Sequence, residues 1–140
     1  MKKVLIDTCV YIDWLNQGRH EDVMLGTGLV RYMSAVVAME LRAGAQHRAA
    51  RDSTSALIRA YRSSGRLVVP SSEVFERAGG VLRQLKLAGR DVRLSSLCND
   101  VLIALTARSI GASVVTANRD DFAAIQRIER FDLMPPWRAL

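Results

Sequence analysis

The sequence contains few of the residues that mark disulfide-rich or zinc-binding proteins. Its 2 cysteines, Cys9 and Cys98, form neither a CxxC pair nor a zinc-binding pattern. We expect both to be free thiols that pack as small apolar side chains. The 2 histidines, His20 and His47, lie in polar stretches, so we expect them at the surface. Together these four residues form no arrangement typical of nucleophilic catalysis.

Long apolar runs are also missing. No stretch approaches the ~20 apolar residues that a membrane-spanning helix requires. The run that follows Met1-Lys2-Lys3 is Val4–Ile6, which is too short for the core of a signal peptide and ends at Asp7. We therefore expect a cytoplasmic protein with no membrane partner. Internal repeats are absent as well, and a chain of 140 residues fits a single domain, residues 1–140.

Positive charge is in excess over negative charge. The chain has 20 Lys and Arg residues against 14 Asp and Glu residues, which gives a net charge of +6. A basic surface is what a phosphate-rich partner requires. Many small basic proteins bind no nucleic acid, so the charge favours a nucleic-acid substrate only modestly.

Short apolar strands alternate with helical segments along the chain. The predicted strands are Val4–Asp7, Leu29–Met33, Arg66–Val69, Ser113–Thr116 and an edge strand at Phe131–Met134. The predicted helices are Val10–Asn16, Ala35–Ala43 with Ser34 as N-cap, Gln46–Arg62, Ser72–Leu87, Asn99–Ser109 and Asp120–Ile125. This alternation predicts an α/β fold with a mostly parallel sheet, whose ligands bind beyond the carboxyl ends of the strands.

Three acids lie in apolar surroundings. Asp7 ends a predicted strand, Glu40 shares a helix face with apolar residues, and Asp100 opens a helix that is apolar nearly all round. Burying an ionised carboxylate without a partner costs several kcal/mol or more. A divalent cation such as Mg²⁺ or Mn²⁺ would offset that cost, because both prefer oxygen ligands.

Each of these acids has an ordinary structural alternative. Asp7 could be a turn residue, Glu40 could pair with Arg42 or another arginine, and Asp100 could interact with a helix dipole. The three alternatives are much less probable together than separately. A fourth group of oxygen donors follows the strand at Ser113–Thr116, where Asn118, Asp120 and Asp121 are all candidates. Asp120 could equally cap the short helix that follows.

These acidic segments occur in a specific order and spacing. They are Val4–Val10, Ser34–Gly44, Asp100–Ala107 and Val115–Phe122. Together they resemble the motifs of PIN-domain nucleases, and specifically of the VapC-like toxins of type II toxin–antitoxin systems. The resemblance runs nearly from end to end and implies a three-layer α/β/α PIN-like domain.

The resemblance also implies roles for particular residues. It gives Asp7, Glu40 and Asp100 as catalytic positions at the metal. We expect Asp7 and Asp100 to bind the metal directly and Asp121 to be the fourth catalytic acid. The supporting candidates are Thr8, Thr116, Asn118 and Asp120. Some relatives carry an acid at the position of Asn118, and others carry it at the position of Asp121. Cys9 stands where many relatives have asparagine, so it should line the site.

The activity implied by the resemblance is that of an endoribonuclease dependent on Mg²⁺ or Mn²⁺. The implied partners are an RNA substrate, a VapB-like antitoxin and a second copy of the chain. Our hypothesis is hydrolysis of an RNA phosphodiester by a metal-activated water. The alternative is a non-catalytic PIN-like module that binds RNA or a protein. Candidate RNA contacts are Arg42, Arg48, Arg90, Arg93 and Arg119.

Overall fold

The computed structural model describes residues 1–137, so the last three residues of the predicted domain lie outside the described part. Its sheet has five strands: β1 (Lys2–Ile6), β2 (Leu29–Ser34), β3 (Leu67–Val68), β4 (Ser113–Val115) and β5 (Leu133–Met134). The strand order is β3-β2-β1-β4-β5, and every neighbouring pair is parallel. The predicted parallel sheet is therefore confirmed.

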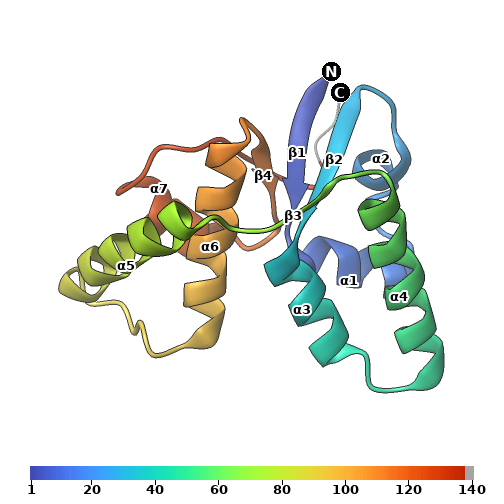
Figure 1. Ribbon diagram of the computed structural model, residues 1–140, viewed down its shortest axis with the longest axis horizontal. Coiled ribbons are helices and arrows are strands. Elements are labelled where there is room, and N and C mark those ends of the chain that lie inside the picture. The colour runs from blue at the N-terminus through green and yellow to red at the C-terminus, as the bar shows by residue number, and fades with distance from the viewer. Residues whose placement is uncertain (138–140) are drawn as a thin grey trace.

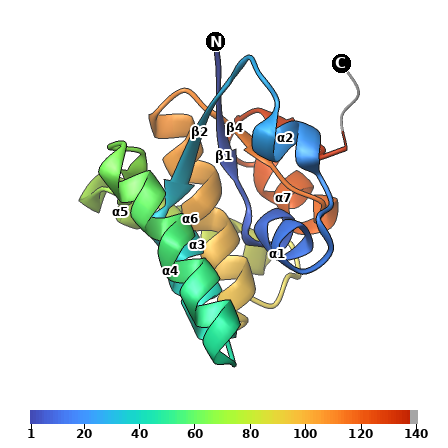
Figure 2. The ribbon, with the colours of Figure 1, turned by 90° about the vertical axis from the view of Figure 1, so that its right-hand side faces the viewer.

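Helices lie on both sides of this sheet and give the predicted α/β/α fold (Figures 1 and 2). They are α1 (Thr8–Gln17), α2 (Glu21–Leu25), α3 (Ala35–Gly44), α4 (Arg48–Ser63), α5 (Ser72–Leu87), α6 (Ser95–Ser109) and α7 (Arg119–Gln126). Figure 1 shows α5, α6 and α7 gathered on the side of β4, and α3 and α4 on the side of β2. None of the helices in residues 1–137 is both long and apolar enough to cross a membrane.

Two helices differ from the expectation by more than two residues. Helix α2 was not predicted, because its five residues are too few to show a periodic pattern. Helix α6 begins at Ser95, earlier than the predicted start at Asn99. Asp100 therefore lies more than one turn inside α6 and does not open it. The structural alternative in which Asp100 meets a helix N-terminus is wrong for this reason.

The central strands bring distant polar residues to one edge of the sheet. Val4, Leu5 and Ile6 are fully buried, as are Val114 and Val115 of the neighbouring strand β4. Asp7 is the one residue between β1 and α1, and its backbone N–H donates to the carbonyl of Val115 at 2.9 Å. The carboxyl ends of β1 and β4 are thus held side by side. Parallel strands place their ligand-binding residues at such an edge.

Candidate metal centre

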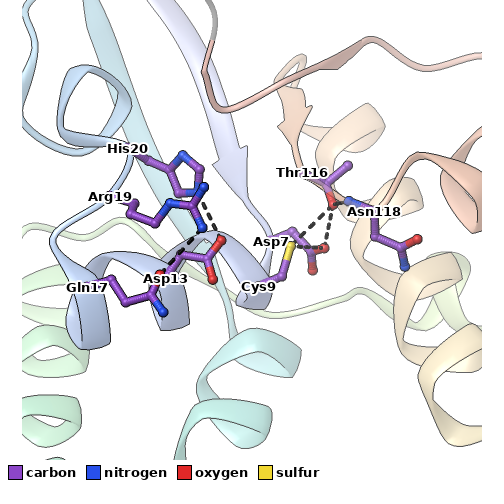
Figure 3. A network of polar contacts seen from close by, with 8 residues as sticks. All are labelled: Asp7, Cys9, Asp13, Gln17, Arg19, His20, Thr116 and Asn118. Atoms are coloured by element: carbon purple, nitrogen blue, oxygen red, sulfur yellow. Dashed lines mark hydrogen bonds and ion pairs between the residues drawn. The ribbon is translucent and has the colours of Figure 1, made fainter.

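Asp7 is buried at the carboxyl end of β1, where neutral donors surround its carboxylate. It also caps α1, because its Oδ1 accepts from the backbone N–H of Thr8 at 2.8 Å. The hydroxyl of Thr116 donates to Oδ2 at 2.7 Å, and the thiol of Cys9 donates to the same oxygen at 3.4 Å (Figure 3). Asp7 can therefore cap α1 with one carboxylate oxygen and still be the predicted metal ligand.

Burial governs the ionisation of Asp7 and Cys9. It raises the pKa of the Asp7 carboxyl above its ordinary value, while the hydrogen bonds from Thr116, Cys9 and Thr8 lower it. Burial also raises the pKa of the Cys9 thiol to about 11, and the charge of Asp7 adds to this shift. Cys9 is therefore a neutral thiol at physiological pH, and it acts here as a hydrogen-bond donor.

Glu40 projects from α3 toward the start of α1. The hydroxyl of Thr8 donates to its Oε1 at 2.7 Å, and the side-chain amide of Asn99 donates to its Oε2 at 3.2 Å. The carboxylate is half-buried, and within residues 1–137 it forms no ion pair. The alternative in which Glu40 pairs with Arg42 is therefore wrong, since Arg42 instead donates to Ser55.

Asp100 projects from α6 and is only 7% exposed. Among the described residues, no side chain or backbone group donates a hydrogen bond to its carboxylate. Its pKa is raised to about 8, chiefly by burial and then by the charges of Asp7, Asp121 and Glu40. The four predicted catalytic acids are thus close enough for their charges to interact.

The fourth group of oxygen donors is divided between the site and the surface. Asn118 is the N-cap residue of α7 but makes no side-chain capping bond, and its backbone N–H donates to Thr116 at 2.9 Å (Figure 3). Asp120 and Asp121 lie in the first turn of α7, so Asp120 does not cap the helix. Asp120 is largely exposed, whereas Asp121 is partly buried. Both accept from the guanidinium of Arg90.

The oxygen donors of the four predicted catalytic acids are of the chemical type that a hard divalent cation prefers. Carboxylate oxygens are the preferred ligands of Mg²⁺ and Mn²⁺. A cation would offset the repulsion that adds to the effect of burial on the pKa of Asp100. Within residues 1–137, however, no three His, Cys, Asp or Glu side chains lie close enough together to hold a metal ion. The acids would have to draw closer to share one cation.

Sequence reasoning missed two residues of this region. The sequence predicts Asn99 as the first residue of its helix, but its contact with Glu40 depends on where α6 begins and how α6 packs against α3. Arg90 was only one of several arginines that could contact RNA, whereas the structure pairs it with Asp120 and Asp121. A contact across 30 residues leaves no signal in local spacing.

The two histidines have local structural roles. His20 was expected at the surface, but its side chain is only 8% exposed and its Nε2 lies 3.0 Å from Asp13 (Figure 3). The expectation for His20 is therefore wrong. His47 is exposed as predicted, and its Nδ1 accepts from the backbone N–H of Ala50 at the start of α4.

Comparison with known proteins identifies the family. The model of the PIN domain matches residues 4–128. The chain belongs to the PIN domain family. PIN domains are typically Mg²⁺-dependent nucleases. No curated protein matches the chain closely enough to count as a relative.

Several solved structures share the fold over nearly the whole chain. DNA-bound VapBC from Salmonella typhimurium is 26% identical, with a TM-score of 0.68 over 97% of this chain and 99% of that chain. FitAcB from Neisseria gonorrhoeae is 22% identical, with a TM-score of 0.70 over 97% and 99%. VapBC2 from Rickettsia felis, bound to a fragment of promoter DNA, is 20% identical, with a TM-score of 0.69 over 95% and 98%. These similarities confirm the resemblance of the fold to VapC-like toxins.

Proposed function

We propose that this protein is a metal-dependent endoribonuclease and the toxin of a toxin–antitoxin pair. The observation that carries the proposal is the Asp100 carboxylate, which is buried, has no described hydrogen-bond partner and is repelled by Asp7, Glu40 and Asp121. Such an arrangement is unfavourable unless Asp100 keeps a proton or the acids share a cation. Residues with strongly shifted pKa values also cluster at functional sites.

In this proposal Asp7 and Asp100 hold Mg²⁺ or Mn²⁺, while Asp121 adds negative charge at the edge of the site. The bound cation would lower the pKa of a water molecule and stabilise negative charge on the phosphodiester. Thr116 and Thr8 would keep the Asp7 and Glu40 carboxylates oriented, as their hydrogen bonds of 2.7 Å do in the structure. Glu40 would orient the attacking water and accept its proton.

The proposed partners are an RNA substrate, a VapB-like antitoxin and a second copy of the chain, in the cytoplasm. The net charge of +6 is favourable for binding a phosphate backbone. The structures similar in fold include a toxin–antitoxin complex from Klebsiella pneumoniae and several VapBC complexes. Their composition supports an antitoxin as the partner proposed for this chain.

The direct test is the substitution Asp7→Asn, which keeps the size of the side chain and removes its charge. We expect it to lower the rate of Mg²⁺-dependent RNA cleavage by at least about 100-fold while the fold stays intact. Cleavage of a labelled RNA and far-UV circular dichroism measure the two effects. The matched control is Asp52→Asn, because Asp52 is an exposed acid on α4 and its substitution should leave cleavage unchanged.

The alternative is a non-catalytic module, which the neutral Asn118 and the open arrangement of the acids favour. Such a module would bind RNA equally well in Mn²⁺ and in a chelator, and it would cleave nothing. If wild-type protein behaves in this way, the nuclease proposal fails. Cleavage that survives unchanged in Asp7→Asn would contradict the assigned site rather than the activity.

A further inference from the structure

Arg90 is held in place by the way α5 ends. Gly89 has a φ of +93°, its N–H donates to the carbonyl of Lys86 at 3.0 Å, and the N–H of Arg90 donates to the carbonyl of Leu85 at 3.0 Å. These two bonds form a Schellman motif, which fixes the direction of the chain after a helix. The backbone of Arg90 is therefore anchored to α5, and only its side chain is free to move.

The guanidinium of Arg90 contacts the first turn of α7. Its Nη1 lies 2.7 Å from Oδ1 of Asp121 and 3.1 Å from Oδ2 of Asp120, and its Nη2 lies 3.4 Å from Oδ1 of Asp120. The Asp120 side chain is 84% exposed and the Asp121 side chain 29% exposed. The shortest contact is thus made to the more buried acid, which is also the one nearer the predicted centre.

Asp121 connects Arg90 with the buried acids. The negative charge of Asp121 repels that of Asp100 and so contributes to the raised pKa of Asp100. A guanidinium 2.7 Å from Asp121 offsets that negative charge where a divalent cation would otherwise be attracted. An open cavity of about 440 Å³ lies beside the pair, lined in part by Gly89, Leu94 and Asp121. The guanidinium therefore has room to leave Asp121 without moving its anchored backbone.

We propose that Arg90 is an internal counter-cation of Asp121, which competes with the divalent ion for this carboxylate and so sets the affinity of the site for metal. The inference rests on the proposed metal-dependent function. Arg90 is a positioning residue in this view, because it acts through Asp121. A purely structural Arg90 would instead fasten α5 to α7 and leave the affinity for metal unchanged.

The experiment is a titration of the full chain with Mn²⁺, in which isothermal titration calorimetry measures the affinity. We expect Arg90→Gln to bind Mn²⁺ roughly three- to tenfold more tightly than wild type, since the Asp121 carboxylate loses its counter-cation. The matched control is Arg93→Gln, which removes the same charge from the same loop. Among residues 1–137 Arg93 pairs only with Asp91, and its side chain is 89% exposed. The affinity of this variant for Mn²⁺ should therefore change less than about twofold.

A second comparison tests the route through Asp121. In an Asp121→Asn background, Arg90→Gln should no longer tighten Mn²⁺ binding, because the carboxylate that it releases is gone. Arg90→Lys keeps the charge but loses the forked geometry, and we expect a smaller gain than with glutamine. Thermal unfolding of each variant identifies any that fails to fold, in which case the lysine variant carries the test.

The outcomes separate this inference from the proposed function. Saturable Mn²⁺ binding by wild type with no gain in Arg90→Gln overturns the role of Arg90 alone. An equal gain in the Asp121→Asn background, or in Arg93→Gln, also overturns it, because the effect would then be one of general charge. If neither wild type nor Arg90→Gln binds Mn²⁺, both the inference and the proposed metal site fail.

Discussion

The two sides of the acidic region satisfy their carboxylates by different means. On the side of β1 and α3, Asp7 and Glu40 accept hydrogen bonds from neutral donors on α1, α6 and the end of β4. On the side of α6 and α7, Asp100 has no described donor and Asp121 is paired with the charged Arg90. The first side is organised without any cation. The second side depends on a retained proton at Asp100 and on the positive charge of Arg90 at Asp121.

The largest effect is expected from the substitution Asp100→Asn. The folded pKa of about 8 lies above the ordinary value of 3.8, so the folded protein keeps this proton to a higher pH than the unfolded chain does. Stability from this group is therefore complete below about pH 4 and is lost as the pH rises to about 8. Asparagine does not titrate, so the variant should lose less stability as the pH rises.

Urea unfolding at pH 5 and pH 9, with a chelator present, measures this difference. Between these values Asp100→Asn should gain on the order of 4 kcal/mol relative to wild type, at roughly 1.4 kcal/mol for each pH unit between pH 5 and the folded pKa. Asp52→Asn on the exposed face of α4 should follow wild type at both pH values. Parallel pH profiles for Asp100→Asn and wild type would show that the Asp100 carboxyl titrates normally.

The sequence was sufficient to predict the fold and three of the acids in the region. The apolar strand before Asp7 and the Ser34 cap before α3 are local patterns, and local patterns survive folding. The predicted sheet follows from strands that alternate with helices. Asp7, Glu40 and Asp100 could be singled out because each interrupts an apolar segment, and the charge of each acts on another in the structure.

The partners of these acids could not be predicted in the same way. Asn99 contacts Glu40 across 59 residues, and Arg90 contacts Asp121 across 31, so neither pair produces a periodic signal. The start of α6 was also missed because its first residues, Ser95 and Ser96, resemble a loop in composition. That Asp121 is the fourth catalytic acid stays a prediction.

A smaller effect is expected from Thr116→Val, on the side with neutral donors. Thr116 is 1% exposed, and its hydroxyl donates to the carboxylate of Asp7 at 2.7 Å. Valine keeps the shape but leaves a buried carboxylate without this donor, which costs about 1.5–3 kcal/mol for a bond to a charged group. Urea unfolding at pH 8 should show this loss, together with slower RNA cleavage. Unchanged stability would mean that Cys9 and Thr8 satisfy Asp7 without help.

The smallest effect, and one of opposite sign, is expected from Thr106→Val. Thr106 on α6 is 2% exposed, like Thr116, but its hydroxyl has no hydrogen-bond partner among residues 1–137. Replacing an unsatisfied buried hydroxyl by a methyl group removes a desolvation cost, so the variant should gain about 1 kcal/mol in unfolding free energy. The same exchange of threonine for valine should therefore stabilise the protein at position 106 and destabilise it at position 116. Of these two hydroxyls, that of Thr116 donates to a carboxylate and that of Thr106 has no described partner. A loss of stability in both variants, measured by urea unfolding, would instead mean that the Thr106 hydroxyl is satisfied in solution.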